Sequence, residues 1–102
     1  MTQNSNQIQA SLEDLSTLEP HEVILVLREI QSRQLLMALA ISGSAIKEAV
    51  YKALPSKAAA MLKSDLEELG PVEQAEVQAA QEAMLSVALR LQSEGKLSIS
   101  KP

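Results

Sequence analysis

Apolar residues recur at steps of three and four positions along most of the chain, a spacing that places them on one face of an α-helix. Interruptions by Pro, Gly and Ser divide this pattern into about six short helices. Their expected ranges are 8–18, 20–30, 33–40, 46–54, 56–69 and a longest helix that ends near residue 93. The pattern therefore predicts an all-α fold class, with the helices packed as one compact bundle.

Residues at the expected helix ends carry capping signals. Ser32 is a candidate N-cap for the third helix, and Gly70 and Gly95 suit the left-handed conformation that closes a helix. The start of the last helix stays open between two positions. The early start has Gly70 as cap, Pro71 as first residue and Glu73 as third-position acid, and the later start has Ala75 as a poor cap. Residues 97–99 alternate apolar and polar, which predicts a short extended segment that lies on the domain.

The apolar stripes also predict which side chains form the core. The third helix is apolar on almost every side, so we expect it to be the most buried segment. Three methionines lie on the stripes and are expected to fill gaps in the core: Met37, Met61 and Met84. The principal core positions are expected to be Leu27, Leu36, Leu39, Val50, Leu62, Leu66, Val77, Met84 and Leu91.

A chain of 102 residues is long enough for one small domain with one core. Residues 1–10 are polar and uncharged, which is typical of a disordered tail, so the single helical domain is expected to span 11–100. The same segment lacks the basic start and apolar stretch of a signal peptide, and no apolar run reaches the roughly 18–20 residues that cross a bilayer. We therefore expect a cytoplasmic protein that does not insert into a membrane.

Charge is distributed unevenly along the chain. The formal net charge of -4 argues against a nucleic-acid partner, which requires clustered Lys and Arg. Five cations and one acid lie between residues 30 and 63, whereas residues 64–89 contain six acids and no cation. This order predicts separate surface patches of opposite sign, around Lys57 and Lys63 and from Glu67 to Glu82, that would orient a charged partner. The alternative is that these are ordinary solvated helix faces.

Residue types that usually carry catalysis are scarce. The sequence has no Cys, and His21 is its only imidazole, so a thiol nucleophile and a paired-histidine metal site are excluded. His21 follows a proline in the first turn of a helix and is expected on the surface. Asp65, Glu67 and Glu68 diverge around their helix, so they predict a solvated face, not an acid/base pair. The sequence thus predicts a non-catalytic protein without metal or cofactor.

Three specific motifs follow residue 56. They read K-A-A-x-M-L-K-x-D-L-E-x-L-G-P-V at 57–72, E-V-x-x-A-Q at 76–81 and R-L-x-x-x-G-K-L-x-I at 90–99. With these motifs, and with L-E-D-L at 12–15 and L-R-E-I at 27–30, the chain resembles the C-terminal domain of the bacterial flagellar motor switch protein FliG over about ninety residues. The family domain is a compact six-helix unit, which agrees with the number of helices expected from periodicity.

The resemblance implies protein interaction, not catalysis. In the family, this domain presents a ridge of charged side chains on one helix to the cytoplasmic loop of the membrane stator, and torque passes through those contacts. Charged contacts suit this task because they act over a distance and break quickly. The implied partners are the stator loop or the rotor and switch proteins, and the implied location is the cytoplasmic face of the flagellar basal body.

Only part of the family's charged ridge is present. Lys57 stands where the family has Arg, which keeps the charge but loses the planar fork that binds carboxylates bidentately. Asp65 matches the second of two adjacent family Asp residues, and Ser64 replaces the first. Ala40 stands where the family commonly has Lys, and Glu73 where it has Arg. One net positive charge in the family pattern becomes one net negative charge here, which indicates weakened stator coupling.

Two questions of context stay open. The Met-Phe-x-Phe hinge that precedes this domain in the family is absent near residues 9–12, and the family's N-terminal and middle domains lie outside these 102 residues. The chain is therefore either a fragment or a free-standing single-domain relative, and Met1 with its polar start favours the second. The alternative function is that of a regulatory or scaffold protein unrelated to motility, which kept the fold and lost the torque ridge.

Overall fold

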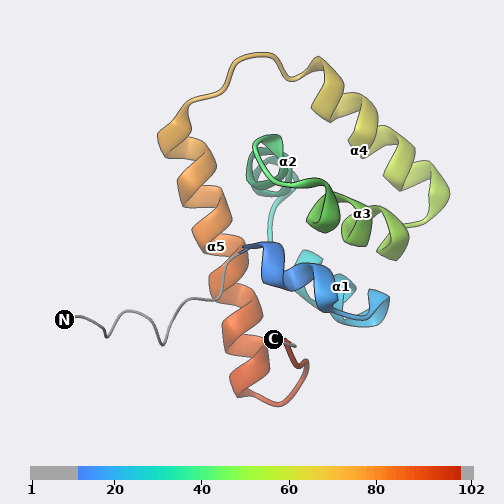
Figure 1. Cartoon of the computed structure of the whole chain (residues 1–102), viewed down its shortest axis with the longest axis vertical. Helices are drawn as coiled ribbons and strands as arrows, with labels where there is room; N and C mark the ends of the chain where they lie inside the picture. The colour runs from blue at the N-terminus through green and yellow to red at the C-terminus, as the bar shows by residue number, and fades with distance from the viewer. Residues whose placement is uncertain (1–11, 100–102) are drawn as a thin grey trace.

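The computed structural model describes residues 12–99, and helices dominate that range (Figure 1). The expected tail of residues 1–10 lies outside the described residues. In chain order, the elements are η2 (Leu12–Thr17), α1 (Pro20–Leu27), α2 (Ser32–Ala40), α3 (Ser44–Ala53), α4 (Ser56–Glu68) and α5 (Gln74–Ser93). The all-α prediction is confirmed, since residues 12–99 contain no strand, and the first expected helix is a 3₁₀ helix over its described part.

The longest helix, α5, packs against η2, α1 and α2. Figure 1 shows α5 along one side of the molecule and α4 at the opposite edge, joined by the segment 69–73 across the top of the view. α2 packs against both α5 and α4, and α3 packs against η2, α1 and α4. At the α2–α5 contact, Gln81 donates from Nε2 to the carbonyl oxygen of Ala38 at 3.0 Å, which satisfies a carbonyl near the end of α2. α4 packs against α2 and α3 on one side, and the residues on its other side are exposed.

The core confirms most of the positions expected from periodicity. Leu39, Val50, Leu62, Val77, Met84 and Leu91 are buried. α2 contributes three consecutive buried residues, Met37–Leu39, as expected for a helix that is apolar on almost every side. Three predicted core positions are wrong, because Leu27, Leu36 and Leu66 are only half-buried. They pack against the margin of the core, where other helices cover them only in part.

The N-cap of α2 lies one residue before the predicted cap. Gln31, not Ser32, is the N-cap, and Ser32 is the first residue of the helix. The Gln31 N–H donates to Oε1 of Gln34 at 2.9 Å, as in a capping box. The Ser32 prediction was wrong because Gln31 and Gln34 form the capping box, so Ser32 becomes the first residue of the helix.

Two glycines end the last two helices as predicted. Gly70 has φ 71° and Gly95 has φ 78°, both in the left-handed region that glycine adopts without steric strain. Because Gly70 is left-handed, it does not take the extended conformation of an N-cap, and Pro71 does not begin α5. α5 begins instead at Gln74, with Glu73 as its N-cap, so the helix starts between the two expected positions and two residues before the start that Ala75 would cap.

The segment after α5 lies on the domain, as predicted. Leu97 and Ile99 are buried, whereas Ser98 between them is exposed. The Ser98 N–H donates to Glu22 Oε2 at 3.1 Å, and the Ile99 N–H donates to Gln92 Oε1 at 2.7 Å. Side chains of α1 and α5 therefore accept the hydrogen bonds that the backbone of a neighbouring strand would accept in a sheet.

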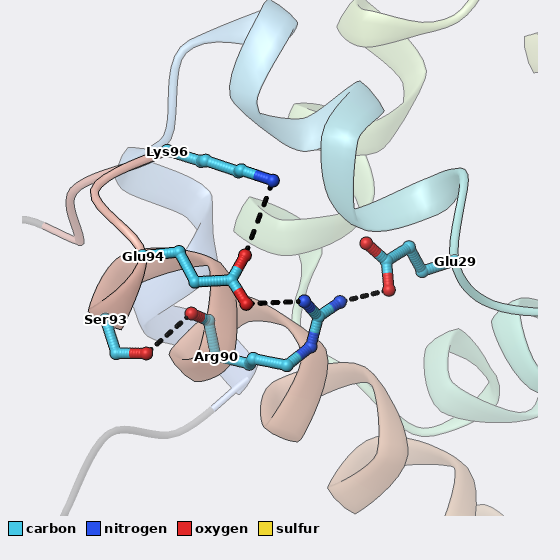
Figure 2. Close-up of polar contacts among 5 residues, drawn as sticks. All are labelled: Glu29, Arg90, Ser93, Glu94 and Lys96. Atoms are coloured by element: carbon cyan, nitrogen blue, oxygen red, sulfur yellow. Dashed lines mark hydrogen bonds and ion pairs between the residues drawn. The ribbon is translucent and has the colours of Figure 1, made fainter.

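An ion-pair network ties the end of α5 to the connection between α1 and α2 (Figure 2). Arg90 pairs with Glu29, and its Nη1 lies 3.0 Å from Glu94 Oε2. Lys96 Nζ lies 3.4 Å from the other carboxylate oxygen of Glu94. The Ser93 hydroxyl donates to the Arg90 carbonyl oxygen at 2.7 Å, which closes the last turn of the helix. One guanidinium thus links two segments that are far apart in sequence.

The network lowers the pKa of the Glu94 carboxyl, chiefly through the hydrogen bond from Arg90, with a smaller contribution from Lys96. We expect NMR titration to place the Glu94 midpoint lower in the native chain than in Arg90→Gln. Because the folded-state pKa lies below that of the unfolded chain, Glu94 stabilises the fold above the ordinary carboxyl pKa, and this contribution disappears as pH falls through the lowered pKa. Equal midpoints in the two proteins would contradict the network.

Candidate functional site

The exposed face of α4 carries three of the five positions of the expected charged ridge. Lys57, Ser64 and Asp65 all lie on this helix and are exposed. Lys57, Met61 and Asp65 follow one another at steps of four residues, so they lie one above another on one face. We call Lys57, Met61, Ser64 and Asp65 the α4 ridge. Among residues 12–99, neither Lys57 nor Asp65 takes part in an ion pair.

The other two ridge positions belong to different helices. Ala40 is the last residue of α2 and is half-buried. Glu73 is exposed and immediately precedes α5. The structure therefore gathers Lys57, Ser64 and Asp65 on one helix face, whereas Ala40 and Glu73 lie at helix ends.

An apolar groove of about 360 Å³ lies between α2 and α4, beside the α4 ridge. Met61 stands at its edge with 59% of its surface exposed. Half-buried leucines form much of the wall, and a cation and an acid lie at the rim. The lining residues are Ser32, Arg33, Leu35, Leu36, Leu54, Ala58, Met61, Leu62 and Asp65. We call this feature the α2–α4 groove.

The exposure of Met61 overturns its prediction as a core residue. Met37 and Met84 are buried, as expected, at 2% and 1% exposure. Met61 differs because it shares the outer face of α4 with Lys57 and Asp65, while Leu62 next to it points into the core. Its distance of four residues from two charged residues was the signal that sequence reasoning missed.

Arg33 at the groove rim is already engaged within the domain. Its Nε donates to Glu76 Oε2 at 2.7 Å, and its Nη2 donates to Glu76 Oε1 at 3.1 Å. This two-point contact with Glu76 raises the pKa of Arg33, chiefly through the hydrogen bonds, and places an opposite charge against its guanidinium. Asp65 is left as the unmatched charge at the rim.

Cations and acids also meet around Tyr51 on the other side of α4. Lys63 Nζ lies 4.9 Å from the centre of the Tyr51 ring, a cation–π distance. The pKa of Tyr51 is raised, first by burial and then by Glu48 and Glu67. The prediction of separate patches of opposite sign is therefore wrong here, because Lys63 and Glu67 are one helical turn apart and both lie close to this ring. Arg33 and Glu76 join the two stretches at a second point.

The described part of the chain offers little for catalysis. His21 is exposed, as expected, and so are Asp65, Glu67 and Glu68. Within residues 12–99, no cluster of three His, Asp or Glu side chains is placed to hold a metal ion. Over the same residues, no helix combines the length and the apolar character of a membrane span. The features that stand out are an exposed charged ridge and an apolar groove, which are typical of a domain that binds other proteins.

Comparison with known proteins shows the family of this domain. Residues 5–99 match the FliG C-terminal domain. The chain is 36% identical over 89 residues to the flagellar motor switch protein FliG of Thermotoga maritima, and this match covers 87% of the chain and 27% of that protein. Against the FliG of Pseudomonas aeruginosa, identity is 36% over 85 residues, covering 83% of the chain and 25% of the relative. The chain belongs to the FliG C-terminal domain family, and it spans about a quarter of the length of these relatives.

Solved structures agree with this assignment. The crystal structure of residues 116–343 of H. pylori FliG superposes with a TM-score of 0.84 at 21% identity, covering 93% of this chain and 42% of that one. Full-length FliG from Aquifex aeolicus gives a TM-score of 0.79 at 26% identity, covering 88% of this chain and 28% of the other. The fold expected from the resemblance is therefore confirmed.

Proposed function

We propose that the chain is a non-catalytic interaction module of the flagellar motor switch, and that it meets a protein partner through the α4 ridge. The observation that carries the proposal is the placement of Lys57 and Asp65. Both are exposed on one face of α4, and neither forms an ion pair within residues 12–99. Charges that are not matched inside the domain are available to orient a partner and to fix its register.

The partner that best fits the family is the cytoplasmic loop of the stator, and the site of action is the cytoplasmic face of the basal body. The five-position charged ridge of the family is altered at Ala40, Ser64 and Glu73, where the family pattern has Lys, Asp and Arg. A single exposed ion pair contributes about 0–1 kcal/mol, so one loss would be tolerated. A reversed charge adds repulsion to lost attraction, so the three changes together weaken coupling to an ordinary stator.

The altered ridge also supports a second candidate, a regulatory or scaffold protein unrelated to motility. The specific observation is Glu73, which is exposed before α5 where the family pattern has a cation. In this alternative, the domain binds a partner of different charge and takes no part in rotation.

A graft tests the proposal. Residues 12–99 would replace the C-terminal domain of a working FliG protein, and two quantities would be measured: incorporation into the rotor and rotation of tethered cells. We expect normal incorporation with slow or absent rotation. Rotation of tethered cells at the full rate would contradict the loss of ridge function, and exclusion of the graft from rotors would contradict the assignment to the motor switch.

A further inference from the structure

Two of the charged residues of α4, Lys57 and Asp65, are placed symmetrically about Met61. Lys57 lies four residues before it and Asp65 four residues after it. At a rise of about 1.5 Å per residue, each charge lies about 6 Å from Met61 along the helix axis, and all three positions fall within about a quarter of the helix circumference. A helix with this pattern is complementary to its own reversed copy, because reversal exchanges the positions of the cation and the acid.

We propose that two copies of the chain associate through their α4 ridges, antiparallel about a two-fold axis that passes near Met61. In this arrangement, Lys57 of each copy faces Asp65 of the other, so the interface contains two identical ion pairs. A two-fold interface requires that the same surface complement itself, and the α4 ridge meets this requirement. A parallel arrangement is disfavoured because it would place like charges opposite each other.

The groove beside the ridge supplies the apolar part of the interface. Met61 is the most exposed large hydrophobic side chain on α4, and the wall next to it is lined by Leu35, Leu36 and Leu54, which are half-buried. Seating Met61 of each copy in the other's α2–α4 groove removes these side chains from water. The flexible thioether of Met adapts to an irregular groove. Ala60, which is small and exposed, also lies on the outer side of α4 and permits close approach.

The charges at the groove rim favour the second copy's Lys57. Arg33 is engaged by Glu76 at 2.7 Å and 3.1 Å, so it does not compete for Asp65. Asp65 is therefore the unmatched charge at the rim of the groove, and its carboxylate attracts a cation. Because the same chain carries that cation four residues from the side chain that fills the groove, a second copy satisfies both the apolar and the charged requirement.

Sedimentation velocity of the purified 102-residue chain over a range of concentrations provides the test. We expect a reversible dimer that weakens as salt is added, since exposed ion pairs are screened. Lys57→Glu and Asp65→Lys should each weaken the dimer by roughly tenfold or more, because each replaces two attractions with two repulsions. Lys52→Glu makes the same change of charge at an exposed position on α3 and should leave the dimer intact.

A mixture of the two ridge variants separates this arrangement from other modes of association. The acidic ridge of Lys57→Glu complements the basic ridge of Asp65→Lys, so equal amounts of the two should form a heterodimer although each alone is monomeric. Circular dichroism checks that both variants keep their helical content, which we expect because both positions are exposed. A native chain that stays monomeric at every concentration, a dimer that ignores both substitutions, or a mixture that stays monomeric would overturn the proposal. None of these measurements involves the flagellar motor, so failure of this proposal is distinguishable from failure of the graft experiment.

Discussion

Replacement of Leu39 by Ala is expected to lower the free energy of unfolding by about 2–5 kcal/mol. Leu39 is 0% exposed and lies on α2, which packs against α5. The loss combines the transfer free energy of the removed atoms with the cavity that they leave. Because small domains are stable by about 5–15 kcal/mol, a change of this size removes a large share of the total. Urea denaturation followed by circular dichroism measures it.

Leu36→Ala is the matched control for this prediction. The substitution removes the same atoms from the same helix, yet Leu36 is half-buried and lines the α2–α4 groove. We expect less than half the loss seen for Leu39→Ala, because water already reaches part of the side chain. Equal losses at the two positions would show that the groove is closed and would contradict the placement of α4.

The largest functional effect is expected from restoring the family's charges in the grafted rotor. Ala40→Lys, Ser64→Asp and Glu73→Arg together should recover part of the rotation that the unmodified graft lacks. The substitutions replace repulsion at Glu73 with attraction and add a cation and an anion where the family pattern has them. The rotation speed of tethered cells measures the recovery.

Rotor incorporation has to be measured in the same cells. Ser64 and Glu73 are exposed and Ala40 is half-buried at the end of its helix, so the three substitutions should not disturb the core. Equal incorporation with faster rotation assigns the gain to coupling with the stator. Normal incorporation without any gain would favour the regulatory or scaffold alternative.

Periodicity predicted the helices well because a helix forms through contacts between residues close in sequence, and because its apolar residues recur along one face. It failed at Met61, which is exposed, and at Leu27, Leu36 and Leu66, which are half-buried at the margin of the core. Met61 and Leu66 lie on α4, which is covered on one side only. An apolar stripe shows which face a helix can bury, but whether another helix covers that face depends on the tertiary arrangement. The spacing of apolar residues within α4 therefore did not show that this helix lies at the edge of the bundle.

The charged contacts show a second limit of sequence reasoning. Arg33 and Glu76 are 43 residues apart, and their pairing depends on how α2 packs against α5. Charge order along the chain therefore did not predict charge order on the surface. The part of the family motif that contains Lys57, Ser64 and Asp65 lies within the single helix α4, and the three residues share its exposed face.

The comparison of two triple variants in the grafted rotor tests most directly whether the ridge controls coupling. The first is Ala40→Lys, Ser64→Asp and Glu73→Arg. The matched control makes the same three residue changes at exposed positions of α3 and α5: Ala45→Lys, Ser86→Asp and Glu82→Arg. Both change the net charge by the same amount, so only position differs between them. We predict that tethered cells carrying the first triple rotate faster than those with the unmodified graft, whereas the control triple gives no gain. Equal rotation with both triples would contradict the account.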